Sequence, residues 1–329
     1  MGARIGLEQG WSHIYSLTAQ QDMFAQLRPH VAFGDGQRLV SPPPYVWLLV
    51  PLVGFGAANT VYIWLALSVM ALIAAWWLAA PGQGPTRWLW LLGAFAWYPL
   101  LYALALVQPD IIVVLVVAVA WKLSQAGRPL LAGVVMGLTV LKPQLTLLVP
   151  IVLLVSGRWK IAAAWALTAG ALALASLLLI GDQGFKDYMA LLDEARHVTN
   201  NRYFTLAYLF GPGLLTDVGQ GIVVGIAIVA AYMNRRSSLD RVFALGIVAS
   251  MLGATYWHLQ DFTILVIAGW FFWRDDPPAS QQWWLLLVAI AAEFAWLLTP
   301  LAILIGVAVW FAFLVTPRRP EPKAAPAHA

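Results

Sequence analysis

The fold is decided by residues 108–155, which read QPDIIVVLVVAVAWKLSQAGRPLLAGVVMGLTVLKPQLTLLVPIVLLV. Apolar runs at 111–124, 130–141 and 144–155 are separated by a basic break that holds Lys122 and Arg128 and by a second break at Lys142-Pro143-Gln144. A straight helix needs about 20 apolar residues to cross the hydrocarbon core of a bilayer. These shorter runs therefore predict membrane helices that are broken, re-entrant or protected by neighbouring helices.

The composition of the whole chain indicates the same class of protein. Of its 329 residues, 61% are hydrophobic and 10% are charged, whereas a soluble domain has about 25% charged residues. This composition excludes soluble enzymes and disordered chains. The net charge of +4 does not indicate nucleic-acid binding, because the basic residues lie singly or in pairs between apolar runs, where they orient helices in a membrane. The chain has no cysteine, which excludes disulfides, thiolate catalysis and Cys-ligated metals.

Three regions follow from the distribution of the apolar runs. Residues 1–43 are polar and mixed, without the pattern of a signal peptide, and we expect an extramembrane or interfacial segment. Residues 44–316 predict an all-α, polytopic membrane bundle of roughly ten to twelve helices, because a strand barrel would need alternating ten-residue segments. Residues 317–329 are rich in proline and alanine, which predicts a disordered cytoplasmic tail.

The basic residues predict the orientation of the bundle. From residue 120 onward they fall at every second junction between apolar runs, and the positive-inside rule assigns those junctions to the cytoplasm. The junctions are marked by Lys122 and Arg128, by Arg158 and Lys160, by Arg235, Arg236 and Arg241, by Arg274, and by Arg318, Arg319 and Lys323. Four polar clusters would then share the outer face, namely 108–110, 142–144, 181–216 and 258–261. The topology of the first three apolar runs is left open.

Ionisable side chains at membrane depth usually face a water-filled cavity or a partner, because their insertion into hydrocarbon is costly. Asp110 follows a proline and either caps the start of a helix or lines a site. Snorkelling would explain Lys142 alone. A proline break that opens on a cavity explains Lys142 and Gln144 together, and a lysine there suits a phosphate.

Two further groups at membrane depth have both a structural and a functional interpretation. His258 and Asp261 are three residues apart, so they share a face if the turn is helical, and a carboxylate can fix the tautomer of a nearby imidazole. They form either a structural pair or part of a site. Glu293 lies in the middle of the run 283–299 and is the deepest carboxylate, but the sequence does not name its partner.

Taken in order, these clusters resemble glycosyltransferase family 87, multi-pass enzymes of the GT-C type that use polyprenyl-phosphate sugars. Residues 41–52 resemble the family's Tyr-Pro-Pro segment and the short apolar helix after it. Residues 107–110 are similar to its Gly-Gln-x-Asn element, with valine for the glycine and aspartate for the asparagine. Residues 132–144 are similar to its Gly-x-x-x-Gly-Leu…Lys-Pro stretch, and 258–261 to its His-x-x-Asp element.

The resemblance implies a GT-C-like bundle in a bacterial plasma membrane, with its active site on the outer face. It implies transfer of a hexose, with mannose expected, from a polyprenyl-phosphate donor to a lipid or glycan acceptor. The expected partners are this donor, the acceptor and membrane lipids. Lys142 and His258 would stabilise the leaving phosphate, so no metal or cofactor is expected. The implied site residues are His258 and Asp261 as catalytic residues, with Asp261 holding His258, and Gln108, Asp110, Lys142 and Gln144 as substrate-binding residues.

One feature of the family is not matched. Its members carry an acidic residue, taken as the catalytic base, at the outer end of a first membrane helix upstream of the segment that residues 3–15 resemble. We therefore expect either a truncated start or a protein that lacks this base, because Asp22 and Asp35 do not lie where the resemblance would put it. The alternatives are a lipid or solute transporter, in which the same clusters line a path, and a catalytically inactive homologue.

Overall fold

The computed structural model describes residues 1–295 and 297–317, and throughout these ranges the regular elements are helical. The predicted all-α bundle is confirmed. The predicted tail lies outside the described residues except for Pro317. The α-helices are α1 (Gly2–Glu8), α2 (Leu17–Leu27), α3 (Pro43–Leu49), α4 (Ala57–Ala79), α5 (Thr86–Ala96), α6 (Tyr98–Ala105), α7 (Asp110–Gln125), α8 (Pro129–Gly137), α9 (Val149–Val155), α10 (Trp159–His197), α11 (Ala207–Phe210), α12 (Leu214–Met233), α13 (Leu239–Leu252), α14 (Leu265–Arg274), α15 (Ala279–Glu293) and α16 (Leu301–Val315).

Seven short 3₁₀ helices complete the described ranges, and several of them flank the polar clusters. They are η1 (Trp11–His13), η2 (Asp35–Gln37), η3 (Val50–Phe55), η4 (Leu138–Leu141), η5 (Pro143–Thr146), η6 (Thr199–Arg202) and η7 (Leu259–Ile264). Lys142 lies between η4 and η5, and η7 begins directly after His258.

In the described ranges, three helices are long and apolar enough to cross a membrane, namely α4, α10 and α12. The pair α5 and α6, which is bent by 59°, would make a fourth span. The expected ten to twelve helices therefore do not correspond to full-length spans. Proline breaks divide the apolar runs, and 129–141 and 143–155 form shorter apolar helices on either side of Lys142, as the run lengths indicated.

The basic junctions at residues 122–128, 158–160, 235–241 and 274 gather at one end of the bundle, which we call the basic end. Arg158 donates hydrogen bonds to the carbonyl oxygens of Arg235 and Ser237, at 3.3 and 2.8 Å. Arg274 donates to Asp240 at 3.1 Å, and this carboxylate also accepts from the side-chain amide of Gln125 at the end of α7. The helices between these junctions therefore start and finish at common ends, which is what the alternation of charge predicts.

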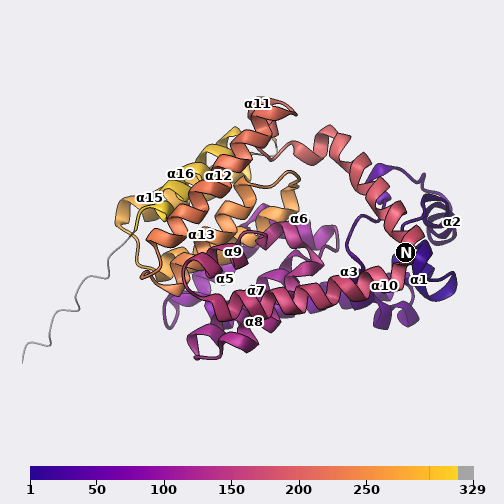
Figure 1. Ribbon diagram of the computed structural model, residues 1–329, viewed down its shortest axis with the longest axis horizontal. Coiled ribbons are helices and arrows are strands. Elements are labelled where there is room, and N and C mark those ends of the chain that lie inside the picture. The colour runs from indigo at the N-terminus through magenta and orange to yellow at the C-terminus, as the bar shows by residue number, and fades with distance from the viewer. Residues whose placement is uncertain (296, 318–329) are drawn as a thin grey trace, which may run out of the picture.

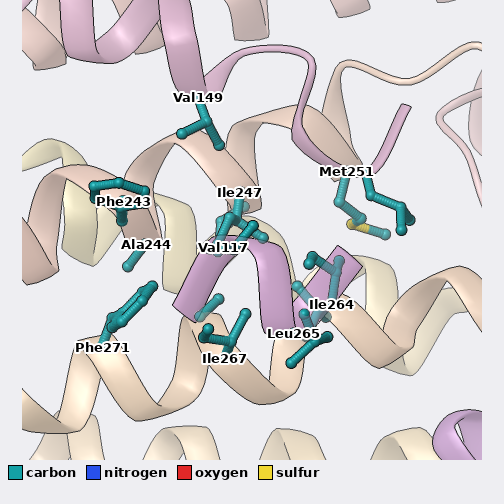
Figure 2. Packing of buried hydrophobic residues seen from close by; sticks show 14 of the residues in the cluster. Val117, Val149, Phe243, Ala244, Ile247, Met251, Ile264, Leu265, Ile267 and Phe271 are labelled. Carbon is teal, nitrogen blue, oxygen red and sulfur yellow. The ribbon is translucent and has the colours of Figure 1, made fainter. Parts of the chain in front are cut away.

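The core of the bundle is built around α13, in which every residue from Asp240 to Leu252 is buried. Figure 2 shows Phe243 and Ile247 of this helix packed among side chains of α7, α9 and α14. Gly246 permits close approach of α9, because a Cβ added there would lie 2.7 Å from the Cα of Val149. Small residues allow membrane helices to pack at such short range.

Helices α8 and α10 pack through two glycines, which accounts for part of the family-like stretch at 132–144. A Cβ at Gly133 would lie 2.3 Å from the carbonyl oxygen of Ile161, and a Cβ at Gly137 would lie 2.5 Å from Thr168. Both contacts leave no room for a side chain. This packing fixes the direction in which α8 and η4 lead to Lys142.

The N-terminal segment has a core of its own, in which Ile5, Ile14 and Tyr15 pack with Ile180 of α10. Helix α10 bends at Gly181, whose φ of 65° suits glycine. In Figure 1, α10 runs beside α8 toward α1 and α2 and then turns back toward α11. The N-terminal helices therefore lie at the end of the bundle opposite the basic end.

The first apolar run does not cross the bundle. The hydroxyl of Tyr45 in α3 donates to the carbonyl oxygen of Val107, at 3.2 Å, just before α7 begins. At the other end of the run, Thr60 near the start of α4 donates to the carbonyl oxygen of Leu52 at 2.8 Å. Residues 43–55 consequently stay at one end, and α4 is the first helix that crosses. These contacts place the first of the three apolar runs whose topology the sequence left open.

Candidate active site

A buried lysine lies between two buried carboxylates where α7, η5 and η7 begin. The ammonium Nζ of Lys142 is 2.8 and 3.0 Å from the two carboxylate oxygens of Asp110 and 2.5 Å from Oδ1 of Asp261. It also donates to Oε1 of Gln108 at 3.3 Å. Both aspartates have 0% exposed surface. The contacts of Lys142 thus unite three of the four polar clusters, and we call this end of the bundle the site end.

Local sequence explains why these side chains meet. Asp110 begins α7 after Pro109, and Lys142 has a φ of −151° between two 3₁₀ turns because Pro143 interrupts the helix after it. Asp261 lies in the first turn of η7, where its Oδ2 accepts a hydrogen bond from the backbone N–H of His258 at 2.9 Å. The N-cap position of α7 is Pro109, and the carboxylate of Asp110 accepts from Lys142.

The imidazole of His258 has partners other than Asp261. Its Nε2 is 2.7 Å from Oδ1 of Asn201, and its Nδ1 is 3.1 Å from the hydroxyl of Tyr256. Asn201 is oriented by Nδ2, which donates to the carbonyl oxygen of Ala195 at 2.7 Å, so its Oδ1 accepts. Nε2 therefore donates and Nδ1 accepts, which is a neutral tautomer. Asp261 does hold His258, but through the backbone N–H of that residue rather than through its ring.

Burial sets the charge of this imidazole. His258 lies in the loop between α13 and η7, outside the helices, and desolvation lowers its pKa below the ordinary value of 6.5. Asp261 acts in the opposite direction and Lys142 adds to the lowering, but burial is the largest of these effects. The imidazole is therefore an uncharged hydrogen-bonding group at neutral pH.

The remaining predicted site residue lies outside this network. Gln144 is half-buried in η5, and its amide has no side-chain hydrogen bond to any residue in the described ranges. Two residues that the sequence did not indicate take part instead. Asn201 lies in η6, within the polar segment 181–216, and Tyr256 lies two residues before His258. Neither Asn201 nor Tyr256 is part of a sequence motif that marks it as functional.

The backbone before Gln108 is strained. Val107 has a φ of 57°, a left-handed conformation that a β-branched residue rarely adopts. Its carbonyl oxygen accepts the hydrogen bond from Tyr45. Because the family-like element has glycine at this position, the conformation explains that preference, and the valine is tolerated at a cost.

Glu293 has a structural partner that the sequence could not name. Its carboxylate accepts from the backbone N–H of Tyr98, at 3.0 and 3.2 Å, at the bend between α5 and α6. The same bend is tied to η7, because Trp97 donates to the carbonyl oxygen of Phe262 at 3.2 Å and Thr263 donates to that of Pro99 at 3.1 Å. Glu293 thus supports the element that carries Asp261.

The described residues contain no group of three or more His, Asp or Glu side chains arranged to hold a metal ion. The chemistry that the cluster itself offers is that of a buried cation, two carboxylates, an amide and a neutral imidazole at the end of a membrane bundle. Such groups bind a phosphate or sugar oxygens and stabilise a leaving anion.

A helical membrane protein with such a cluster fits the membrane glycosyltransferases, and comparison with known families supports this class. The model of glycosyltransferase family 87 matches residues 40–328. The match covers most of the chain, so the protein belongs to glycosyltransferase family 87 and is a membrane glycosyltransferase. No curated protein and no solved structure matches the chain.

Proposed function

We propose that this protein transfers a hexose, with mannose as the expected sugar, from a polyprenyl-phosphate donor to a lipid or glycan acceptor. The reaction takes place at the site end, which faces the outside of a bacterial plasma membrane, with residues 1–43 as an interfacial segment there. The observation that carries the proposal is the convergence of Gln108, Asp110, Lys142 and Asp261 on one point, reached from three segments distant in sequence.

A phosphate would bind at Lys142 by exchange with a carboxylate. With both carboxylates ionised, Lys142 and its two aspartates carry a net charge of −1, so the ammonium has no spare charge at rest. A donor phosphate that approaches Lys142 takes over hydrogen bonds now made by a carboxylate. The carboxylate released in this way becomes free to accept a proton.

This exchange suits an inverting displacement. The acceptor hydroxyl loses its proton to a base as its oxygen bonds to the anomeric carbon, and the bond from that carbon to the phosphate oxygen breaks. Asp110 and Asp261 are the two carboxylates at the cluster, and Lys142 stabilises the departing phosphate. The neutral His258, which is fixed by Asn201, adds a hydrogen-bonding group without adding charge.

The position of the cluster also distinguishes the enzyme from a transporter. A transporter of the inverted-repeat type places its site near the bilayer midplane between repeats. Here Asp110, Lys142 and Asp261 lie where α7, η5 and η7 begin, at one end of the bundle. This location favours chemistry at a membrane surface.

Reconstituted protein with radiolabelled polyprenyl-phosphate mannose and membrane lipids tests the proposal. We expect Lys142→Gln to lower transfer by about 100-fold, because a donor of charge-assisted hydrogen bonds to the leaving group is lost. His258→Ala should lower it by about tenfold or more. Lys122→Gln, an exposed residue near the basic end, is the control and should leave transfer unchanged.

Lys142→Gln leaves two buried carboxylates without a cation, so misfolding must be separated from loss of chemistry. The double variant Asp110→Asn with Lys142→Gln has the same net charge as the wild-type cluster and should recover a large part of the thermal midpoint that Lys142→Gln loses. A double variant that folds and transfers the sugar as well as the wild-type protein would refute the role of the cluster.

A further inference from the structure

A charged cavity that is open to the surface lies at the basic end, where the turn between α7 and α8 meets the start of α10. It has a volume of about 430 Å³ and is lined by Gly127, Arg128, Pro129, Leu130, Leu131 and Lys160. Helix α8 begins at this cavity and leads through η4 to Lys142, so the cavity and the catalytic cluster lie at opposite ends of one segment.

The two cations of this cavity are not neutralised by the protein. Neither Arg128 nor Lys160 makes an ion pair or side-chain hydrogen bond with any residue in the part of the chain that the structure describes. Arg158, which lies close by in sequence, is by contrast committed to the carbonyl oxygens of Ser156 and Ser237. The cavity therefore presents two available positive charges and lacks a lining carboxylate.

Apolar side chains continue the same surface toward the membrane. Leu130 is 60% exposed, Leu131 is 52% exposed and Trp159 is 58% exposed. The ammonium of Lys160 lies 5.9 Å from the centroid of the Trp159 ring. An exposed tryptophan beside a lysine is the arrangement found at the headgroup level of a bilayer. The surface thus combines a site for an anion with a site for hydrocarbon.

We propose that this cavity binds a phospholipid with an anionic headgroup. The headgroup phosphate occupies the space between Arg128 and Lys160, and the acyl chains lie along Leu130, Leu131 and Trp159. Basic pockets between membrane helices suit such headgroups. A bound lipid of this kind bridges α8 and α10, the two helices whose packing through Gly133 directs the chain to Lys142.

The test is a lipid titration of the full chain in mild detergent, followed by native mass spectrometry, with phosphatidylglycerol and phosphatidylcholine as probes. Wild-type protein should bind phosphatidylglycerol more tightly. The double variant Arg128→Gln with Lys160→Gln should weaken that binding by roughly 25-fold, from a contribution of about fivefold for each cation. Leu130→Ser should weaken it without any change of charge.

The control removes two other exposed basic residues near the same end, as Lys122→Gln with Arg236→Gln. It should retain phosphatidylglycerol binding, because neither residue lines the cavity. Equal weakening in both double variants would show general charge attraction and overturn the proposal, as would unchanged binding in the Arg128 and Lys160 variant. Displacement of the lipid by free inorganic phosphate at millimolar concentration would overturn the assignment to a lipid.

Discussion

The ammonium of Lys142 lies 2.8 Å from an oxygen of Asp110 and 2.5 Å from an oxygen of Asp261, and the three residues come from segments that begin separate helical elements. One cation thus joins α7, the break after η4, and η7. Because both carboxylates are buried, this contact also holds the end of the bundle together.

The stability of this triad depends on the balance of charge within it. Lys142→Met leaves two buried carboxylates unpaired and should lower the free energy of unfolding by about 3–5 kcal/mol. Adding Asp110→Asn should recover a large part of that loss, because one of the two uncompensated charges is removed. Thermal unfolding in detergent measures both. No recovery in the double variant would mean that the lysine acts through packing rather than charge.

Burial of His258, whose Nε2–H donates to Oδ1 of Asn201, should keep its imidazole uncharged. Because burial lowers the imidazole pKa in the folded state, the unfolded chain binds more protons, and stability should fall as pH drops below about 6.5. His258→Gln should remove this dependence, and Asn201→Asp should oppose it by favouring the charged ring. Thermal midpoints between pH 5 and 8 provide the measurement, and identical curves for all three proteins would contradict the assignment.

Replacement of Val107 by glycine should stabilise the folded protein. Its left-handed backbone costs about 1–2 kcal/mol for a residue with a Cβ, and the extra flexibility of glycine in the unfolded chain offsets part of the gain from relieving it. Val107→Gly should therefore raise the free energy of unfolding by up to about 1 kcal/mol. Val107→Ala, which keeps a Cβ, is the control. If alanine stabilises as much as glycine, the side chain and not the backbone is the source of the strain.

The contact between α8 and α10 should tolerate no added methyl group. Gly133→Ala places a Cβ against the carbonyl oxygen of Ile161 and should lower stability and transfer together. Gly170→Ala in α10 is the matched control, since nothing lies within 4 Å of the position that its Cβ would take and alanine favours a helix. If Gly170→Ala lowers stability and transfer as much as Gly133→Ala does, α10 as a whole resists substitution.

Much of the helical bundle and of the candidate site could be predicted from the sequence, because both depend on features that recur along the chain. The alternation of basic junctions predicted that residues 108–110, 142–144 and 258–261 share one end, and the contacts of Lys142 bring these three clusters together. The proline at 143 predicted the break at which this lysine lies. Those signals are local, and the cost of placing charge in a membrane makes them strong.

Other parts depend on contacts between distant segments and have no local signal. Glu293 is bound by a backbone N–H 195 positions away in the chain, and such a donor has no side-chain identity to recognise. Asn201 reaches His258 only because α10 bends at Gly181 and returns over the site end. The course of that return depends on tertiary packing rather than on sequence spacing.

The most direct test of the central claim is the choice of sugar donor by the reconstituted wild-type protein. Vesicles that contain the protein and acceptor lipids receive labelled mannose, either as polyprenyl-phosphate mannose or as a nucleotide sugar. The label that reaches the acceptor is measured for the wild-type protein and for Lys142→Gln. We predict transfer from the polyprenyl-phosphate donor alone and its near loss in the variant. Transfer from the nucleotide sugar alone, or equal transfer by both proteins, would contradict the account.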